Sequence, residues 1–396
     1  MEKKAANGVK TMGVVLCAVV WWSVIAMGTA AAQPDTARSG SGPEIEQEIR
    51  QTIRMQAGAV NAGDWERFKE LLWENDRTYI QERKRWFEDA VSHIDRGTFQ
   101  MEVESVAPYK PGLLLVNVRQ HYKLDGVRHS VRLPLIYQQT ARGWKDADLL
   151  FDTMTRKNVT VKFSDRLLSE KAKVALNVGE KALEAFNERL QWEPDAPIQI
   201  KLYHDIEVFR QSVKPSLPKW VVGWNERGQA IKFVGSLTAD SNDETFASGI
   251  VHEISHRVIS DMSHDNAAYW LQEGLAEYYQ RHLLPGLHLE GDAQLKKPRW
   301  TLQQLEELNL ESLSAREASL YYAHSYDVVR FFMREYGEKD LVEWCAALKM
   351  YPDIDQESAI KRRELNLRTR EAFEKATNQP FREFARAWIN QYENLK

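Results

Sequence analysis

The spacing of apolar residues changes once along residues 44–155. Ile45, Ile49 and Ile53 begin a run at the three-to-four-residue spacing of a helix. Two further helical stretches are expected at residues 65–73 and 78–94, and Asp64 is placed to cap the first of them. This part of the chain is therefore predicted to begin with three helices.

The residues after these helices alternate between apolar and polar, which is the spacing of strands with one buried face. Strands are predicted at residues 98–107, 113–124, 127–139 and 144–152. Asp125-Gly126, between the second and third stretches, is a strong signal for a hairpin turn. Helices followed by an antiparallel sheet indicate an α+β domain.

The element order and the stretch "NAGDWERFKELL" at 61–72 make this segment similar to the SnoaL-like cone fold of the nuclear-transport-factor-two-like superfamily. The resemblance implies a first domain over residues 44–155. Such cones hold ligands or catalytic pairs, but the histidines here are scattered. We expect the domain to serve support, protein interaction or dimerisation.

The second half of the chain is predicted to be mostly helical with a small sheet. A long apolar stripe predicts a helix at 164–190, and short alternating stretches predict strands at 198–203 and 230–237. Further helices are expected at 206–212, 244–262, 302–310, 317–336, 339–349, 363–376 and 381–393. We assign residues 156–396 to one domain.

The N-terminus has the pattern of a targeting segment. Three lysines precede an almost wholly apolar run, and Ala30-Ala31-Ala32 offers small residues for cleavage before Gln33. We interpret residues 1–32 as a signal peptide of an exported protein and residues 33–43 as a linker. The alternative is an uncleaved membrane anchor, because the weakly polar run at 11–32 is long enough to span a bilayer.

Composition narrows the class of protein. The chain has 396 residues, of which 43% are hydrophobic and 28% charged, so two or three packed domains are expected. The formal net charge is -4 and no basic run occurs, which argues against a nucleic-acid partner. Cleavage after Ala32 would leave Cys345 as the one cysteine, so stability must come from apolar cores rather than disulfides.

Chemistry is concentrated at His252-Glu253-Ile254-Ser255-His256, which reads H-E-x-x-H. Residues four apart share one helix face, so two imidazoles can point at one cation, with Glu253 beside them. The apolar stripe of this helix falls on another face. Alone, such a motif can arise by chance on a surface helix.

A second predicted helix supplies a third ligand. The stretch from Trp270 to Tyr278 contains Glu273, and Glu277 four residues later lies on the same face. Two imidazoles, a carboxylate and one open position form the ligand set of a catalytic zinc. We expect Glu277 to accept a hydrogen bond from a ligand imidazole, and the small Gly274 to let this helix approach its neighbour closely.

The stretches "VHEISH" and "WLQEGLAEYY" are similar to the gluzincin metallopeptidases, in particular the peptidase MA-like domain of exported bacterial proteins. The similarity extends over residues 160–396 through "AIKFVG", "YYAHSYDVVRFFMREYG" and "FREFARAWINQY". It implies a thermolysin-like fold that binds one zinc ion per chain and acts on a peptide or protein substrate.

The same resemblance assigns roles to individual residues. It implies that His252, His256 and Glu273 bind zinc and that Glu253 is the general base. It also implies an oxyanion-stabilising tyrosine, for which Tyr322 fits best and Tyr321 is the neighbouring alternative.

The sequence departs from the family at one place. The G-x-M-E-N segment of gluzincin aminopeptidases is absent, and "IKFVGSLT" stands in its position, so aminopeptidase activity is not implied. We expect an edge strand here that binds an extended peptide. Its residues are Ile231, Lys232, Phe233 and Val234.

A second hypothesis comes from another class of protein. The chain would then be an envelope-associated binding or scaffolding factor with a structural zinc and no turnover. The complete ligand set together with Glu253 favours the enzyme.

Overall fold

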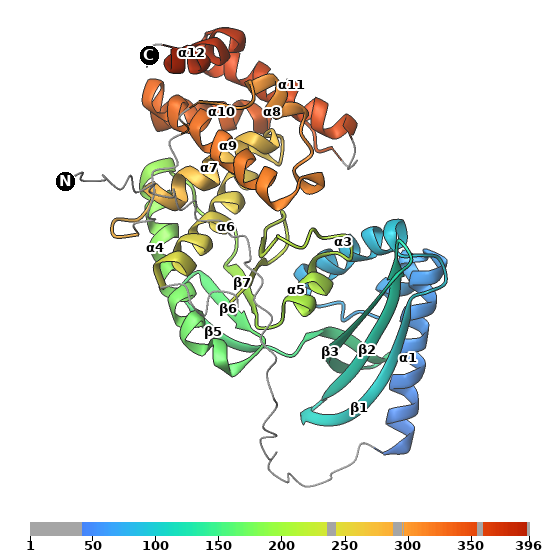
Figure 1. Ribbon diagram of the computed structural model, residues 1–396. Helices are drawn as coiled ribbons and strands as arrows, with labels where there is room; N and C mark the ends of the chain where they lie inside the picture. The colour runs from blue at the N-terminus through green and yellow to red at the C-terminus, as the bar shows by residue number, and fades with distance from the viewer. Residues whose placement is uncertain (1–41, 236–242, 288–294, 296, 355–358, 394–396) are drawn as a thin grey trace, which may run out of the picture. The chain divides into compact units, whose positions relative to one another are not determined.

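The computed structural model describes residues 42–235, 243–287, 295, 297–354 and 359–393 (Figure 1). The predicted signal segment and nearly all of the predicted linker lie outside these residues. Contacts divide the described residues into one compact unit up to Asp261 and another from Met262 onward, so the division falls inside one helix.

The first unit begins with three helices, as the apolar spacing predicted: α1 (Pro43–Ala62), α2 (Trp65–Lys69) and α3 (Arg77–His93). Asp64 caps α2, since its side chain accepts a hydrogen bond from the backbone N–H of Arg67. Asp76 caps α3 in the same way at Tyr79. These caps satisfy amide groups that have no partner within their helices.

Four antiparallel strands follow in the order β1–β2–β3–β4, as predicted. They are β1 (Gln100–Lys110), β2 (Leu113–Leu124), β3 (Val127–Thr140) and β4 (Gly143–Leu149). Asp125-Gly126 forms the turn between β2 and β3, and both residues have positive φ. Helix α1 runs along one face of this sheet (Figure 1).

A second, five-stranded sheet has the order β5–β6–β7–β9–β8. Its strands are β5 (Asp152–Arg156), β6 (Val159–Phe163), β7 (Ile198–Tyr203), β8 (Gly223–Trp224) and β9 (Ile231–Val234). Strands β6, β7 and β9 are parallel, and the outer strands β5 and β8 are antiparallel to their neighbours. The long helix α4 (Ser169–Leu190) packs beside β6, and α5 (Ile206–Val213) follows β7.

The two sheets of the first unit share one apolar core. Ile53 of α1 and Val116 of β2 belong to the same buried cluster as Tyr203 of β7, Phe209 of α5 and Val234 of β9. Since the side chains of both sheets leave water together, they stabilise one another. The first four-stranded sheet is thus packed as part of a larger body.

Charged side chains are also buried in the first unit, where β7 meets α3. Lys201 of β7 places its Nζ atom 2.7 Å from Glu82 of α3 and 2.6 Å from Asp148, and its side chain is 1% exposed. Burial raises the pKa of a carboxyl group, but the ammonium groups of Lys201 and Lys232 outweigh it and lower the pKa of Glu82. Opposite charges and hydrogen bonds thus compensate for the loss of water.

Helix α6 (Asp243–Ser263) leads into the second unit, which is helical in its described residues. Its helices are α7 (Tyr269–His282), α8 (Leu302–Glu307), α9 (Ala315–Glu335), α10 (Gly337–Lys349), α11 (Ala359–Thr377) and α12 (Phe381–Glu393). Gly337 has φ +79° and begins α10 directly after α9. The α+β fold class is confirmed.

Cys345 is a buried free thiol, as expected, and burial raises its pKa to about 12. Among the described residues, no helix combines the length and apolar character that crossing a membrane requires.

Candidate metal centre

The apolar stripe of α6 fixes which way its histidines face. Four residues spaced four apart along the helix are fully buried: Phe246, Ile250, Ile254 and Val258. His252 and His256 lie off this stripe and are partly exposed. The sequence pattern therefore predicted correctly that one side of α6 packs and another presents two imidazoles.

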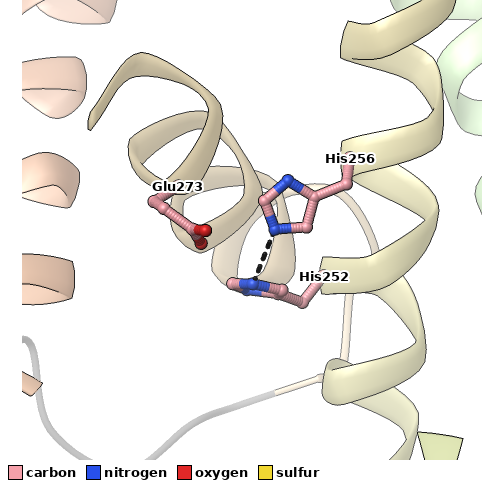
Figure 2. A group of neighbouring side chains, drawn as sticks. All are labelled: His252, His256 and Glu273. Carbon is pink, nitrogen blue, oxygen red and sulfur yellow. Dashed lines mark hydrogen bonds between the residues drawn. The ribbon is translucent and has the colours of Figure 1, made fainter. Parts of the chain in front are cut away.

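The two imidazoles converge. Nε2 of His252 and Nε2 of His256 are 3.1 Å apart. Figure 2 shows Glu273 on α7 with its carboxylate directed toward them. One ligand atom from each of the three residues lies within 4.8 Å of the others. The connection between α6 and α7, residues 264–268, is short, so the placement follows from two neighbouring helices.

These distances fit a small cation. Two nitrogen ligands about 2.0–2.1 Å from one tetrahedral zinc ion lie roughly 3.3 Å apart, close to the separation of the two Nε2 atoms. A carboxylate can complete three protein ligands and leave one position open. The three residues can therefore hold a metal ion, and their donor set suits zinc.

Helix α7 is held in place by a close helix contact on α9. A Cβ added at Gly274 would lie 2.7 Å from the backbone carbonyl carbon of Ser325 and 2.6 Å from a methyl carbon of Val329. Such distances leave no room for a side chain. The expected close approach at Gly274 is confirmed, and it fixes the backbone of the adjacent Glu273.

The carboxylate of Glu253 lies against the second sheet. The Glu253 side chain is 7% exposed. A Cβ added at Gly223 of β8 would lie 2.8 Å from the carboxyl carbon of Glu253 and 3.1 Å from the ring of Phe233. The carboxylate predicted as general base therefore lies directly against the backbone of β8.

The prediction that residues 231–234 form an edge strand is wrong. Strand β9, residues 231–234, pairs with β7 on one side and with β8 on the other, so it lies inside the sheet. All four of its side chains are buried. Nζ of Lys232 donates to the carbonyl oxygen of Ser212 and to Gln229, inside the protein. These residues cannot receive a peptide as an added strand.

Among the described strands, the outer strand on this side of the sheet is β8. Gly223 pairs with Phe233 and Trp224 pairs with Lys232, and β8 is the last strand of the sheet. The sequence analysis predicted no strand at these residues. A glycine next to a tryptophan was the available signal, because a glycine in a strand often marks a close backbone approach.

The two tyrosines proposed for the oxyanion differ in environment. Tyr321 is 1% exposed, and burial followed by the charge of Glu273 raises its pKa well above the ordinary value. Tyr322, the next residue of α9, is partly exposed. The assignment of the oxyanion donor to Tyr322 stays a prediction.

Glu277 has a partner on its own helix. Its carboxylate forms an ion pair with Arg281, whose guanidinium also donates to the carbonyl oxygen of Glu277 at 2.8 Å. The predicted hydrogen bond from a ligand imidazole to Glu277 stays a prediction.

The other histidines near this region serve other contacts. His282 is 3.1 Å from the hydroxyl of Tyr326, and His324 accepts a hydrogen bond from the backbone of Arg299. Among the described residues, the one three-residue metal-ligand group contains neither of them, nor His264. His288 lies outside the described residues.

The comparisons with known proteins agree with a peptidase-like fold. Residues 179–360, just under half of the chain, match the model of the Peptidase MA superfamily, and this range includes every residue of the candidate metal centre. The matched part of the chain is thus similar to peptidases of that superfamily. None of the curated proteins compared with the chain matches it.

One similar solved structure is the crystal structure of Legionella pneumophila aminopeptidase A in complex with aspartic acid. It is 13% identical, with a TM-score of 0.35, and the alignment covers 74% of this chain and 32% of that one. The chain therefore spans about a third of the length of that structure.

Proposed function

We propose that the protein is a zinc-dependent peptidase of the gluzincin type that hydrolyses peptide bonds in an extended substrate. The observation that carries this proposal is the convergence of three metal-ligating atoms from His252, His256 and Glu273, with Glu253 next along the chain from the first ligand. The match to the Peptidase MA superfamily supports the same class.

The metal would be held by the two imidazoles and the carboxylate. Bound zinc supplies positive charge, which polarises a carbonyl group and makes a water molecule more acidic. The protein's contribution is to hold three ligands in one arrangement on two helices. The match to the superfamily supports zinc as the metal.

Glu253 would act as general base and then as general acid. Its carboxylate takes a proton from the attacking water as the new C–O bond forms at the scissile carbonyl. It then delivers that proton to the nitrogen of the breaking C–N bond, so one water is consumed and a carboxylate and an amine result. Tyr322 would donate a hydrogen bond to the oxyanion formed between these steps.

Strand β8 would hold the substrate backbone. It is the last strand of its sheet and lies against Glu253, so a peptide added antiparallel or parallel to it would pass the general base. Backbone pairing of this kind is insensitive to side chains. Sequence preference would then come from the side chains that surround the site.

The experiment is a comparison of wild type with Glu253→Gln in the purified full chain. We expect about one zinc per chain in both proteins, and peptide hydrolysis that chelation removes in the wild type. Glu253→Gln should reduce hydrolysis by at least about 10³-fold because the proton acceptor is gone. Full activity of this variant with metal bound would contradict the mechanism, and stoichiometric zinc without turnover on any peptide library would support a structural site in a binding protein.

We also propose that the chain is exported, on the pattern of residues 1–32. The N-terminal sequence of the protein recovered from its native cells decides this. A new N-terminus at Gln33 supports cleavage by a signal peptidase, and an intact N-terminus in the membrane fraction supports an anchor.

A further inference from the structure

Helix α3 of the first domain turns three residues of one face toward a single segment. Glu82, Arg85 and Asp89 are spaced three and four residues apart, so they lie on one side of the helix. The segment they face is residues 214–230, which connects α5 to β9. Each of the three side chains contacts a different part of it.

The contacts span the segment from beginning to end. Near its start, Asp89 accepts hydrogen bonds from the backbone N–H of Ser216 at 2.9 Å and from its hydroxyl at 2.5 Å. Further along, Nε of Arg85 lies 2.5 Å from Oε1 of Glu226. At its end, the backbone N–H of Ala230 donates to Glu82 at 3.2 Å.

The segment has little regular structure of its own. Within residues 214–230, β8 is the one strand, and it makes two residue pairs with β9. Leu217 and Val221 are buried in the core that the first four-stranded sheet shares with α5 and β7. A connection of this length with so little helix or sheet takes its shape largely from the surfaces on which it packs.

The middle of this segment is the part that lies against Glu253. Gly223 and Trp224 form β8, and the Gly223 backbone approaches the Glu253 carboxylate so closely that no Cβ fits. The middle of the segment is bonded to β9, since the backbone N–H of Val234 donates to the carbonyl oxygen of Val222 at 2.9 Å. The contacts with α3 hold the segment on both sides of this pairing, at Ser216 and at Glu226.

We infer that the Glu82, Arg85 and Asp89 face of α3 positions β8 as the substrate-binding edge of the peptidase site. The first domain is then a working part of the site, and Arg85 and Asp89 are positioning residues that act through the 214–230 segment. This inference rests on the proposed function for the meaning of β8, but the contacts it invokes are independent of the metal. The first domain would then set the geometry of substrate binding in addition to supporting the fold.

Because α3 holds β8 in its binding geometry before substrate binds, substrate binding does not have to order this strand. If the segment loses its contacts to α3, β8 occupies its binding geometry for only a fraction of the time. The apparent dissociation constant then rises by the inverse of that fraction, while chemistry in the bound state is little changed. KM should therefore respond more than kcat.

The test uses Asp89→Ala and Arg85→Ala in the full-length, zinc-loaded chain, with Lys84→Ala as the matched control. Lys84 is an exposed residue of the same helix. Hydrogen exchange is measured on backbone amides of residues 219–226, zinc by metal analysis, and KM and kcat on a quenched fluorescent peptide that the wild type cleaves. Asp89→Asn, which keeps acceptor oxygen, serves as the conservative variant.

We expect exchange in residues 219–226 to rise about tenfold in Asp89→Ala, with zinc content unchanged. KM should rise roughly 3- to 10-fold with kcat within about twofold, and Asp89→Asn should recover most of the loss. Lys84→Ala should match the wild type. Unchanged exchange at β8, faster exchange spread evenly over the whole first unit, or a fall in kcat at constant KM would overturn the inference.

The exchange measurement separates this inference from the proposed function. If the wild type binds no zinc and cleaves no peptide, the proposed function fails, while local exchange at β8 still decides whether α3 holds the segment. If hydrolysis is present and exchange is unaffected by Asp89→Ala, the positioning role of α3 fails alone.

Discussion

The backbone of Gly223 lies against the carboxylate of Glu253, at a distance that leaves no room for a methyl group. Any larger residue at position 223 must push the carboxylate, the strand or the ring of Phe233 aside. A proposed general base is thus held between a helix and a sheet edge.

Gly223→Ala should keep the metal and lose activity. Displacement of Glu253 by about 1 Å is expected to reduce kcat by roughly 10- to 100-fold, because proton transfer depends strongly on geometry. Activity and zinc content are measured on the same preparation. Gly58→Ala is the control, since a Cβ there meets nothing within 4 Å on α1. Wild-type kcat in Gly223→Ala would show that Glu253 does not act from this position.

Replacing Glu273 and Glu277 one at a time should distinguish a carboxylate that binds the metal from one that supports a ligand. Glu273→Ala takes away one of the three ligand atoms that converge in the site, so stoichiometric zinc should be lost on dialysis. Glu277→Gln leaves all three ligands and should retain zinc, with affinity lower by up to about 100-fold if its carboxylate supports a ligand imidazole. Competition with a chelator gives both affinities. Equal zinc affinity in Glu273→Ala and wild type would exclude Glu273 as a ligand.

Lys201 should be among the most costly residues of the first unit to replace. Lys201→Ala leaves Glu82 and Asp148 buried without their shared ammonium group. Removing one partner of a buried ion pair costs about 3–5 kcal/mol, so the urea midpoint should fall clearly with an unchanged slope. Lys157→Ala breaks an exposed pair with Glu184 and should leave the midpoint where it was. Matching midpoints for the two variants would contradict a stabilising role for the buried pair.

The candidate metal centre could be predicted from sequence because its parts are local. His252 and His256 share one helix, and Glu273 follows on the next helix after a short connection. The β2–β3 hairpin was equally accessible, since its Asp125-Gly126 turn sets the register. In such places a few neighbouring residues determine the geometry.

The sheet edge could not be predicted because strand pairing is not local. The alternation of residues 231–234 does not reveal that residues 223 and 224 form a further strand beside them in the sheet. The β5–β6 hairpin was missed for a related reason. Its turn uses Lys157 at positive φ and Asn158, without the glycine that usually announces such a turn. The role of α3 likewise depends on contacts between residues more than a hundred positions apart, such as those of Asp89 with Ser216.

His324 should make the stability of the second unit depend on pH. Its Nε2 atom faces the backbone N–H groups of Arg299 and Trp300, so it must carry a lone pair, and its Nδ1–H donates to the carbonyl oxygen of Leu320 at 2.7 Å. Burial, the largest effect, lowers the pKa of His324 below 6.5, since a charged ring would lose solvent. A proton on Nε2 would also oppose two N–H donors. The folded state therefore holds this ring neutral.

The sign of the effect follows from which state binds the proton. Below pH 6.5 the unfolded chain protonates His324 while the folded chain does not, so the stability that this residue contributes is complete above that value and declines as pH falls toward the lowered pKa. His324→Gln keeps an acceptor for the Arg299 amide and cannot titrate. Its melting temperature should fall less than that of the wild type between about pH 7 and 5. Parallel curves for wild type and His324→Gln would show that His324 is not held neutral.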